Sequence, residues 1–265
     1  MPAAVDTVEV AREVRRSLGF GNEAPLPDLL QVIEEGAGVA VALLELPHKV
    51  ACAYARKEGR GYIFVNASQD LDAQRFALAH SFGHHVLGHR DTIDAEEDLF
   101  GAPKTPAEAS ANKFSAEFLA PAPAVARSLR SWDLTTAADA ARPQTVFRLA
   151  KYFGVSPDLA SAQLATTPLM RGDDLQRRTL GRDTEEDSAT GTVWTPFAIR
   201  QDSLALAQQR LPRMPSALQA DAMRAYTLGF TPLEMLASAL ERDEDEMRTW
   251  LQANGISAPR DIDGY

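Results

Sequence analysis

The chain has 265 residues, a formal net charge of −10 and one cysteine. An acidic surface repels phosphate, so this charge disfavours nucleic-acid binding unless a local basic patch exists. The lone thiol, Cys52, excludes an internal disulfide and is typical of a buried apolar residue in a reducing cytosol. The N-terminal residues lack the basic start and apolar run of a signal peptide, and no stretch is apolar for long enough to span a membrane. We therefore expect a cytoplasmic protein with no membrane association.

The first 66 residues predict two helices followed by three strands. Apolar residues recur at helical spacing over residues 7–19 and again over 26–35, and glycines follow both segments. Runs rich in β-branched residues then predict strands at 38–46, 49–55 and 59–66.

The next hundred residues predict mostly helix. A long helix is expected over 68–89, where apolar residues again recur at helical spacing. The acidic, proline- and glycine-containing stretch 91–106 predicts a loop. A further helix is expected over 106–121, ended by prolines, and two short helices over 144–167.

Composition changes near residue 171. The stretch 171–196 has few core residues and many charges, which predicts a linker or mobile loop. A second helical block follows over about 198–253, and its helix, glycine turn and second helix around Gly229 have the rhythm of a helix-turn-helix. The acidic run 241–246 would repel phosphate, so we favour a small helical bundle that binds protein over a DNA reader.

These patterns suggest four consecutive parts of the chain. They are a first domain at 1–125, a helical extension at 126–170, a linker or mobile loop at 171–197 and a C-terminal helical domain at 198–265.

A histidine pair lies on the long helix predicted at 68–89. His80 and His84 stand at positions i and i+4, which places both imidazoles on one face, where they can share a metal ion. Zinc peptidases use this pair in the motif H-E-x-x-H, whose glutamate activates the zinc-bound water. Here Ser81 stands at the position of that glutamate, and a serine hydroxyl is not an equivalent base. The pair alone is a weak signal, because histidines with this spacing are often ordinary side chains.

Other histidines and acidic residues nearby have simpler interpretations. His85 and His89 enrich the region without improving the geometry, and His89 is one residue short of the third-ligand position in longer zinc motifs. His48 follows a proline in a predicted loop and is expected to be solvated. The acidic run 91–98 is expected to be a solvated face, with a binding edge for a basic partner as the alternative.

Several longer segments together resemble the ImmA/IrrE metallopeptidase family. In that family a strand ending in asparagine leads into an arginine-phenylalanine helix that carries the zinc histidines, and a second helix follows. The matching runs here are IFVN at 63–66, QRFALAH at 74–80, Gly83-His84, EASANKFSAEFLAP at 108–121, and the segment from Leu149-Ala150 to FGVS at 153–156. The resemblance covers roughly residues 10–165. It implies an α+β, zincin-like minimal metallopeptidase fold, a small twisted sheet with active-site helices, followed here by C-terminal helical extensions.

The same resemblance shows two departures at chemically important positions. Ser81 replaces the catalytic glutamate, and Ser110 stands where the family pattern implies the third zinc ligand. Glu108 lies two residues earlier, about 200° around the helix, and is therefore expected to point away from the site unless the helix is shifted. A site of two histidines is poor for zinc, so we expect no zinc or weakly bound zinc. Gly83, Asn112 and Phe114 match family positions, and we take them as candidate binding residues near the old cleft.

These observations favour a catalytically inactive ImmA/IrrE-like protein that acts as a regulator by binding protein. The family's activity in stress response and mobile-element control implies an Xre-type repressor as a partner. The strand at 61–66 is expected to be the exposed edge on which an extended partner segment pairs. The alternatives are an active zinc endopeptidase that cleaves an Xre-type repressor and a DNA-binding transcriptional regulator.

Overall fold

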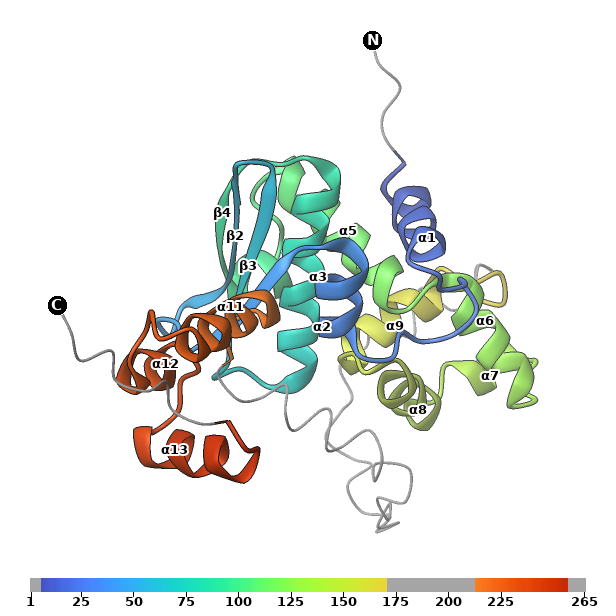
Figure 1. Ribbon diagram of the computed structural model, residues 1–265. Helices are drawn as coiled ribbons and strands as arrows, with labels where there is room; N and C mark the ends of the chain where they lie inside the picture. The colour runs from blue at the N-terminus through green and yellow to red at the C-terminus, as the bar shows by residue number, and fades with distance from the viewer. Residues whose placement is uncertain (1–5, 171–212, 257–265) are drawn as a thin grey trace, which may run out of the picture.

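The computed structural model describes residues 6–170 and 213–256 (Figure 1). The predicted linker at 171–196 lies outside the described residues, and so does the start of the predicted C-terminal helical block. The described residues combine a small four-stranded sheet with many helices. The expected α+β class is therefore confirmed.

The sheet has the strand order β1-β3-β2-β4. Its strands are β1 (Ala40–Leu44), β2 (Val50–Lys57), β3 (Arg60–Asn66) and β4 (Thr92–Ala95). Strand β1 is parallel to β3, whereas β2 is antiparallel to both β3 and β4. The three predicted strands are confirmed, but the expectation that residues 61–66 form an exposed edge is wrong. Because β3 is paired on both sides, the edges are β1 and β4.

The acidic stretch predicted as a loop contains β4 and the short helix α4 (Glu96–Phe100). Its burial alternates, since Ile93 is 77% exposed and Asp94 only 3% exposed. A strand of four residues is too short for alternating burial to be visible in the sequence, and its inward side chain here is a carboxylate. The stretch therefore lacked the apolar pattern by which half-buried strands are recognised.

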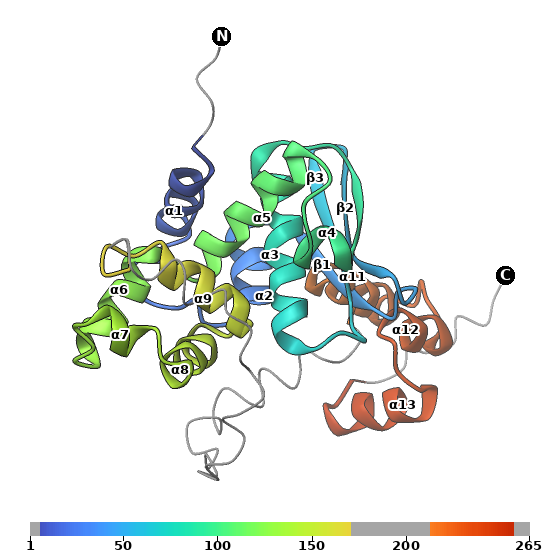
Figure 2. The same ribbon diagram turned by 180° about the vertical axis from the view of Figure 1, so that it is seen from behind.

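Two long helices form the centre of the domain. They are α3 (Leu71–Leu87) and α5 (Pro106–Leu119), and α3 lies between the sheet and α5 (Figure 2). A Cβ atom on Gly83 would come within 3.0 Å of the Phe114 ring and 3.4 Å of the Ala111 backbone, so glycine allows the two helices to cross closely. Gly83 and Phe114 therefore pack in this interface, and the binding role expected of them from the sequence stays a prediction.

The N-terminal segment packs against α5 as helix α1 (Thr7–Ser17), and it is followed by α2 (Leu29–Gln31) and the π-helical turn η1 (Val32–Gly36). Arg15 of α1 is fully buried, and its guanidinium donates to the carbonyl oxygens of Phe118, Gly21 and Ala24. These bonds compensate for the burial of its charge. The second predicted helix begins later than expected, at Leu29 instead of residue 26.

Four further helices lie on the far side of α3 and α5 from the sheet (Figures 1 and 2). They are α6 (Ala122–Ser131), α7 (Ala137–Ala140), α8 (Pro143–Phe153) and α9 (Pro157–Ala165). The predicted pair of short helices at 144–167 corresponds to α8 and α9 and is confirmed. Arg75 of α3 donates to the Gly154 carbonyl between them at 3.0 Å, which fixes this pair to the central helix.

The C-terminal unit consists of α11 (Ser216–Thr227), α12 (Leu233–Ala239) and α13 (Glu244–Ala253). It has a small core of its own, formed by Tyr226, Leu236, Ala237, Met247 and Leu251. The unit lies beside strand β1 (Figure 2), where Arg213 forms an antiparallel bridge with Leu43. It therefore sits at the sheet edge opposite to β4.

Candidate metal centre

Helix α3 carries the two histidines predicted as metal ligands. His80 and His84 are one turn apart, both are fully buried, and their Nε2 atoms lie 2.9 Å from each other. Two imidazole nitrogens this close repel unless a proton or a metal ion lies between them. The predicted pair is thus brought together with both rings facing one point.

Helix α5 adds a carboxylate to this pair. Oε2 of Glu108 lies 3.1 Å from Nε2 of His80 and 3.5 Å from Nε2 of His84. This oxygen is buried and forms no hydrogen bond of normal geometry with any described residue. The expectation that Glu108 points away was wrong. It assumed that Ser110 faces the histidine pair, and Ser110 does not.

Strand β4 brings a fourth group that the sequence reasoning missed. Oδ2 of Asp94 lies 3.6 Å from Nε2 of His80, accepts a hydrogen bond from the Thr92 hydroxyl at 2.9 Å, and faces the Cys52 thiol at 3.8 Å. One ligand atom each from His80, His84, Asp94 and Glu108 lies within 4.8 Å of all the others, and all four residues are buried. The acidic run was expected to be solvated, but Asp94 is buried.

A second set of contacts orients the histidine rings. The Asn112 amide oxygen lies 2.8 Å from Nδ1 of His80, and the amide nitrogen donates to the Asp98 carbonyl at 2.9 Å. The amide oxygen can only accept, so Nδ1 of His80 carries a proton and Nε2 is free for a metal. Nδ1 of His84 lies 3.0 Å from Nδ1 of His89. Asn112 thus positions a ligand, which gives a physical reason for its match to the family pattern.

Ser110 lies outside this set. Its hydroxyl donates to the Ala107 carbonyl at 2.9 Å and lies 3.4 Å from Nε2 of His89, at the side of the centre. His85 faces away from the centre, with Nδ1 3.1 Å from the Tyr54 hydroxyl. Neither residue is placed to contact a metal held by the histidine pair.

Burial and neighbouring charges shift the pKa values of several groups in the centre. Burial alone would lower the pKa of His80, but its close contacts with the carboxyl groups of Asp94 and Glu108 outweigh burial and raise this pKa to about 9. Burial, and next the charge of His80, lower the pKa of His84 to about 4. Burial, and next the charge of Asp94, raise the pKa of the Cys52 thiol well above its ordinary value.

The donor set fits a borderline divalent metal such as zinc. Two neutral imidazole nitrogens and one or two carboxylate oxygens are ligands that zinc takes in proteins, and the orphaned Oε2 atom of Glu108 has no other partner of normal geometry. The expectation of weak or absent zinc depended on a missing third ligand. Because Glu108 places a carboxylate oxygen where a third ligand could bind, the reason for the expectation no longer holds.

Ser81 occupies the position of the family's catalytic base. It is fully buried, and its hydroxyl forms no hydrogen bond of normal geometry with any described residue. The Cys52 thiol is close enough to Ser81 for the hydroxyl to affect its pKa. The helix position after His80 thus carries no group able to take a proton from water near neutrality.

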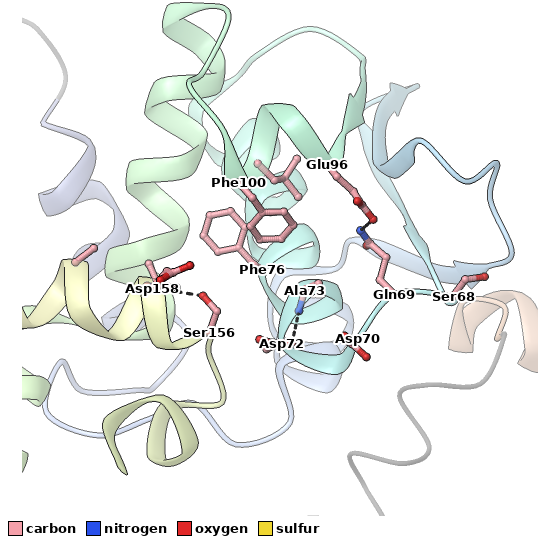
Figure 3. A pocket seen from close by; sticks show the side chains of 13 residues that line it. Ser68, Gln69, Asp70, Asp72, Ala73, Phe76, Glu96, Phe100, Ser156 and Asp158 are labelled. Carbon is pink, nitrogen blue, oxygen red and sulfur yellow. Dashed lines mark hydrogen bonds between the residues drawn. The ribbon is translucent and has the colours of Figure 1, made fainter. Parts of the chain in front are cut away.

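A surface cavity of about 670 Å³ lies near the centre, between the start of α3, helix α4 and the start of α9 (Figure 3). The rings of Phe76 and Phe100 face each other in it, with centroids 5.5 Å apart, and the Phe76 ring lies 6.5 Å from the ring of His80. Four carboxylates line the cavity, those of Asp70, Asp72, Glu96 and Asp158, and its lining includes no lysine or arginine among the described residues.

A family model matches part of the chain. Residues 35–164 match the peptidase M78 family model, described as an IrrE N-terminal-like domain. This region runs from η1 to α9 and includes all four residues of the metal centre. No curated protein matches the chain. Among the described residues, no helix has the length and apolar character needed to cross a membrane.

Proposed function

Because the chain belongs to the ImmA/IrrE family, we propose that it is a regulatory protein that holds zinc in the family's metal site and does not cleave peptides. The proposal has two parts, which are retention of the metal and loss of the peptidase chemistry. We infer further that regulation proceeds by binding another protein.

One observation supports both parts. The metal ligands His80, His84 and Glu108 are assembled around one point, whereas the neighbouring helix position holds the buried Ser81 in place of a glutamate. Bound zinc polarises a carbonyl and lowers the pKa of a coordinated water. A peptidase also needs a residue that accepts the proton of that water, and Ser81 cannot accept it near neutral pH.

The proposed partner is a basic protein, with Xre-type repressors as the class that the family suggests. The net charge of −10 attracts cations over the whole surface. The cavity beside the centre combines Phe76 and Phe100 with carboxylates such as Asp70 and Asp158, which suits a segment containing both apolar and basic side chains. Masking the basic DNA-binding face of such a repressor would regulate it without cleavage.

Metal analysis together with a cleavage assay tests the proposal. The purified protein is expected to retain about one zinc per chain after dialysis, and a His80→Ala variant to lose it. Incubation with an Xre-type repressor is expected to give a complex that weakens as salt rises, with no new fragments. Fragments that disappear when a chelator is added would instead establish an active zinc endopeptidase.

Asp70→Asn with Asp72→Asn tests the cavity separately, because both residues line it and neither lies in the metal centre. The paired change is expected to weaken the complex at least severalfold and leave the zinc content unchanged. As a matched control, Glu9→Gln with Glu13→Gln removes the same charge from α1, where neither side chain lines the cavity. If both double substitutions weakened the complex equally, the net charge of the protein, and not the cavity, would account for binding.

A further inference from the structure

We propose that Asp94 is a fourth protein ligand that closes the metal centre, so that zinc is held by protein atoms alone. The inference rests on the proposed function, because it requires that zinc is bound. It adds a ligand from the sheet edge to the helix-borne set His80, His84 and Glu108. It also gives the loss of peptidase chemistry a second cause besides Ser81.

The distances from His80 to the other three groups suit a tetrahedral metal site. Ligand atoms about 2.0–2.1 Å from a tetrahedral zinc ion lie about 3.3 Å from one another. The Nε2 atom of His80 lies 2.9 Å from Nε2 of His84, 3.1 Å from Oε2 of Glu108 and 3.6 Å from Oδ2 of Asp94. The Asp94 oxygen is somewhat farther from His80 than the other two ligand atoms are, at a distance close to the tetrahedral spacing, and it lies within 4.8 Å of all three.

The carboxylate of Asp94 is held in this position by β4 and its neighbours. Asp94 pairs with Cys52 in the register of β4 and β2, and the hydroxyl of Thr92 donates to its Oδ2 atom. Metal-binding carboxylates commonly have such hydrogen-bonded support, which fixes their orientation. The side chain is 5% exposed, so water contributes little to its solvation.

The serine at position 81 is compatible with this arrangement. Ser81 and Asp94 both lie beside the Cys52 thiol, Ser81 from helix α3 and Asp94 from strand β4. A glutamate at position 81 would bring a second carboxylate toward the space that Asp94 occupies. The small serine side chain therefore leaves room for the carboxylate from the sheet edge, and the two residues are complementary.

Closure has a consequence for ligands. A catalytic zinc site keeps one position for water or substrate, whereas four protein ligands describe a structural site. His80 and His84 are fully buried, and Glu108 is 8% exposed. Small chelating anions are therefore expected to have no coordination position on the wild-type centre.

Cobalt substitution tests this directly. Cobalt(II)-loaded wild-type protein is expected to show the visible spectrum of a four-coordinate ion and to be unaffected by acetohydroxamate. In Asp94→Asn, acetohydroxamate is expected to change the spectrum, and zinc affinity to fall by about tenfold or more. Glu97→Gln, which removes an exposed carboxylate from the adjacent α4, is the matched control and is expected to behave like the wild type.

The outcomes separate this inference from the proposed function. Wild-type protein that binds neither zinc nor cobalt would contradict the proposed function, and the inference with it. Normal zinc affinity in Asp94→Asn, with a spectrum still unaffected by acetohydroxamate, would overturn the inference alone. It would also be overturned if the wild type cleaved peptides and Asp94→Asn kept its metal but lost cleavage, since Asp94 would then be the base.

If Asp94→Asn does not fold, Thr92→Val provides the second test. It removes the hydrogen bond that orients Asp94 and keeps the carboxylate itself. Sensitivity of its cobalt spectrum to acetohydroxamate would support the inference, and an unchanged, insensitive spectrum would overturn it.

Discussion

The two edges of the small sheet serve different purposes. At the β1 edge, Leu43 exchanges backbone hydrogen bonds of 2.8 Å with Arg213, and Glu34 binds the guanidinium of Arg213 at 2.8 Å, so this edge attaches the C-terminal unit. At the β4 edge, Asp94 points inward to the buried histidines while Ile93 points into solvent. One edge is used for attachment and the other for metal chemistry.

This division implies that attachment and metal binding can be perturbed separately. Strand β1 and strand β4, which contributes Asp94 to the metal centre, are at opposite edges of the sheet, with β3 and β2 between them. Sites that share no partners usually contribute independently to stability. The following substitutions test this separation.

Glu108→Gln is expected to have the largest effect. It removes a charged ligand but preserves shape, so zinc affinity should fall by about a hundredfold or more, as measured by competition with a chromophoric chelator. The thermal stabilisation that zinc gives the wild type should largely disappear. The contacts of Arg213 should be unaffected, and a change in hydrogen exchange at the Leu43 amide would show that the two edges are coupled.

Ser81→Glu is expected to destabilise the protein and not to create a peptidase. The site is fully buried beside Cys52, which also contacts Asp94, so a larger, charged side chain must displace its neighbours. Overpacking of this kind costs about 1–3 kcal/mol, before any repulsion between carboxylates is counted. Denaturant unfolding measures the loss. Chelator-sensitive peptide cleavage by this variant would contradict the prediction.

Glu34→Ala tests the opposite edge. The Glu34 carboxylate accepts hydrogen bonds from Val41, Arg213 and Ser216, so its removal leaves several donors without a partner. We expect a loss of about 1–3 kcal/mol in the free energy of unfolding and faster hydrogen exchange at the Leu43 amide. Zinc affinity should not change.

Glu35→Ala is the matched control for Glu34→Ala. This residue is exposed on the same turn, and its carboxylate accepts only from the Gln31 amide at 3.0 Å among the bonds that the described residues form. Its removal should cost less than about 0.5 kcal/mol. A similar loss in both variants would mean that the contacts with Arg213 and Ser216 contribute little to attachment.

The sequence predicted the elements of the fold better than their arrangement. The spacing of His80 and His84 was sufficient to predict that they share a face, because a helix fixes that relation within four residues. No local pattern places β3 between β1 and β2, since strand order depends on long-range pairing. Asp94 was missed for a related reason, because its inward position follows only from the pairing of β4 with β2.

The error at Glu108 has a different origin. Glu108 and Ser110 do point to different sides of helix α5. The prediction was wrong because it assumed that the side carrying Ser110 faces α3. Asn112, four residues after Glu108, shares its face and contacts His80. The i, i+4 pair Glu108 and Asn112 is the signal from which the correct face could have been read.

Ser110→Ala therefore has the smallest expected effect and tests that assignment of faces. The Ser110 hydroxyl lies 3.4 Å from His89 and donates to its own helix at Ala107, so it supports the histidine pair only through His89. We expect zinc affinity to stay within about threefold of the wild type, below the 10–100-fold loss typical of a residue that directly supports a ligand. The chelator competition used for Glu108→Gln measures both variants on one scale. If Ser110→Ala lost zinc as strongly as Glu108→Gln, α5 would present the face that carries Ser110 to the metal, and the ligand set described for the centre would be wrong.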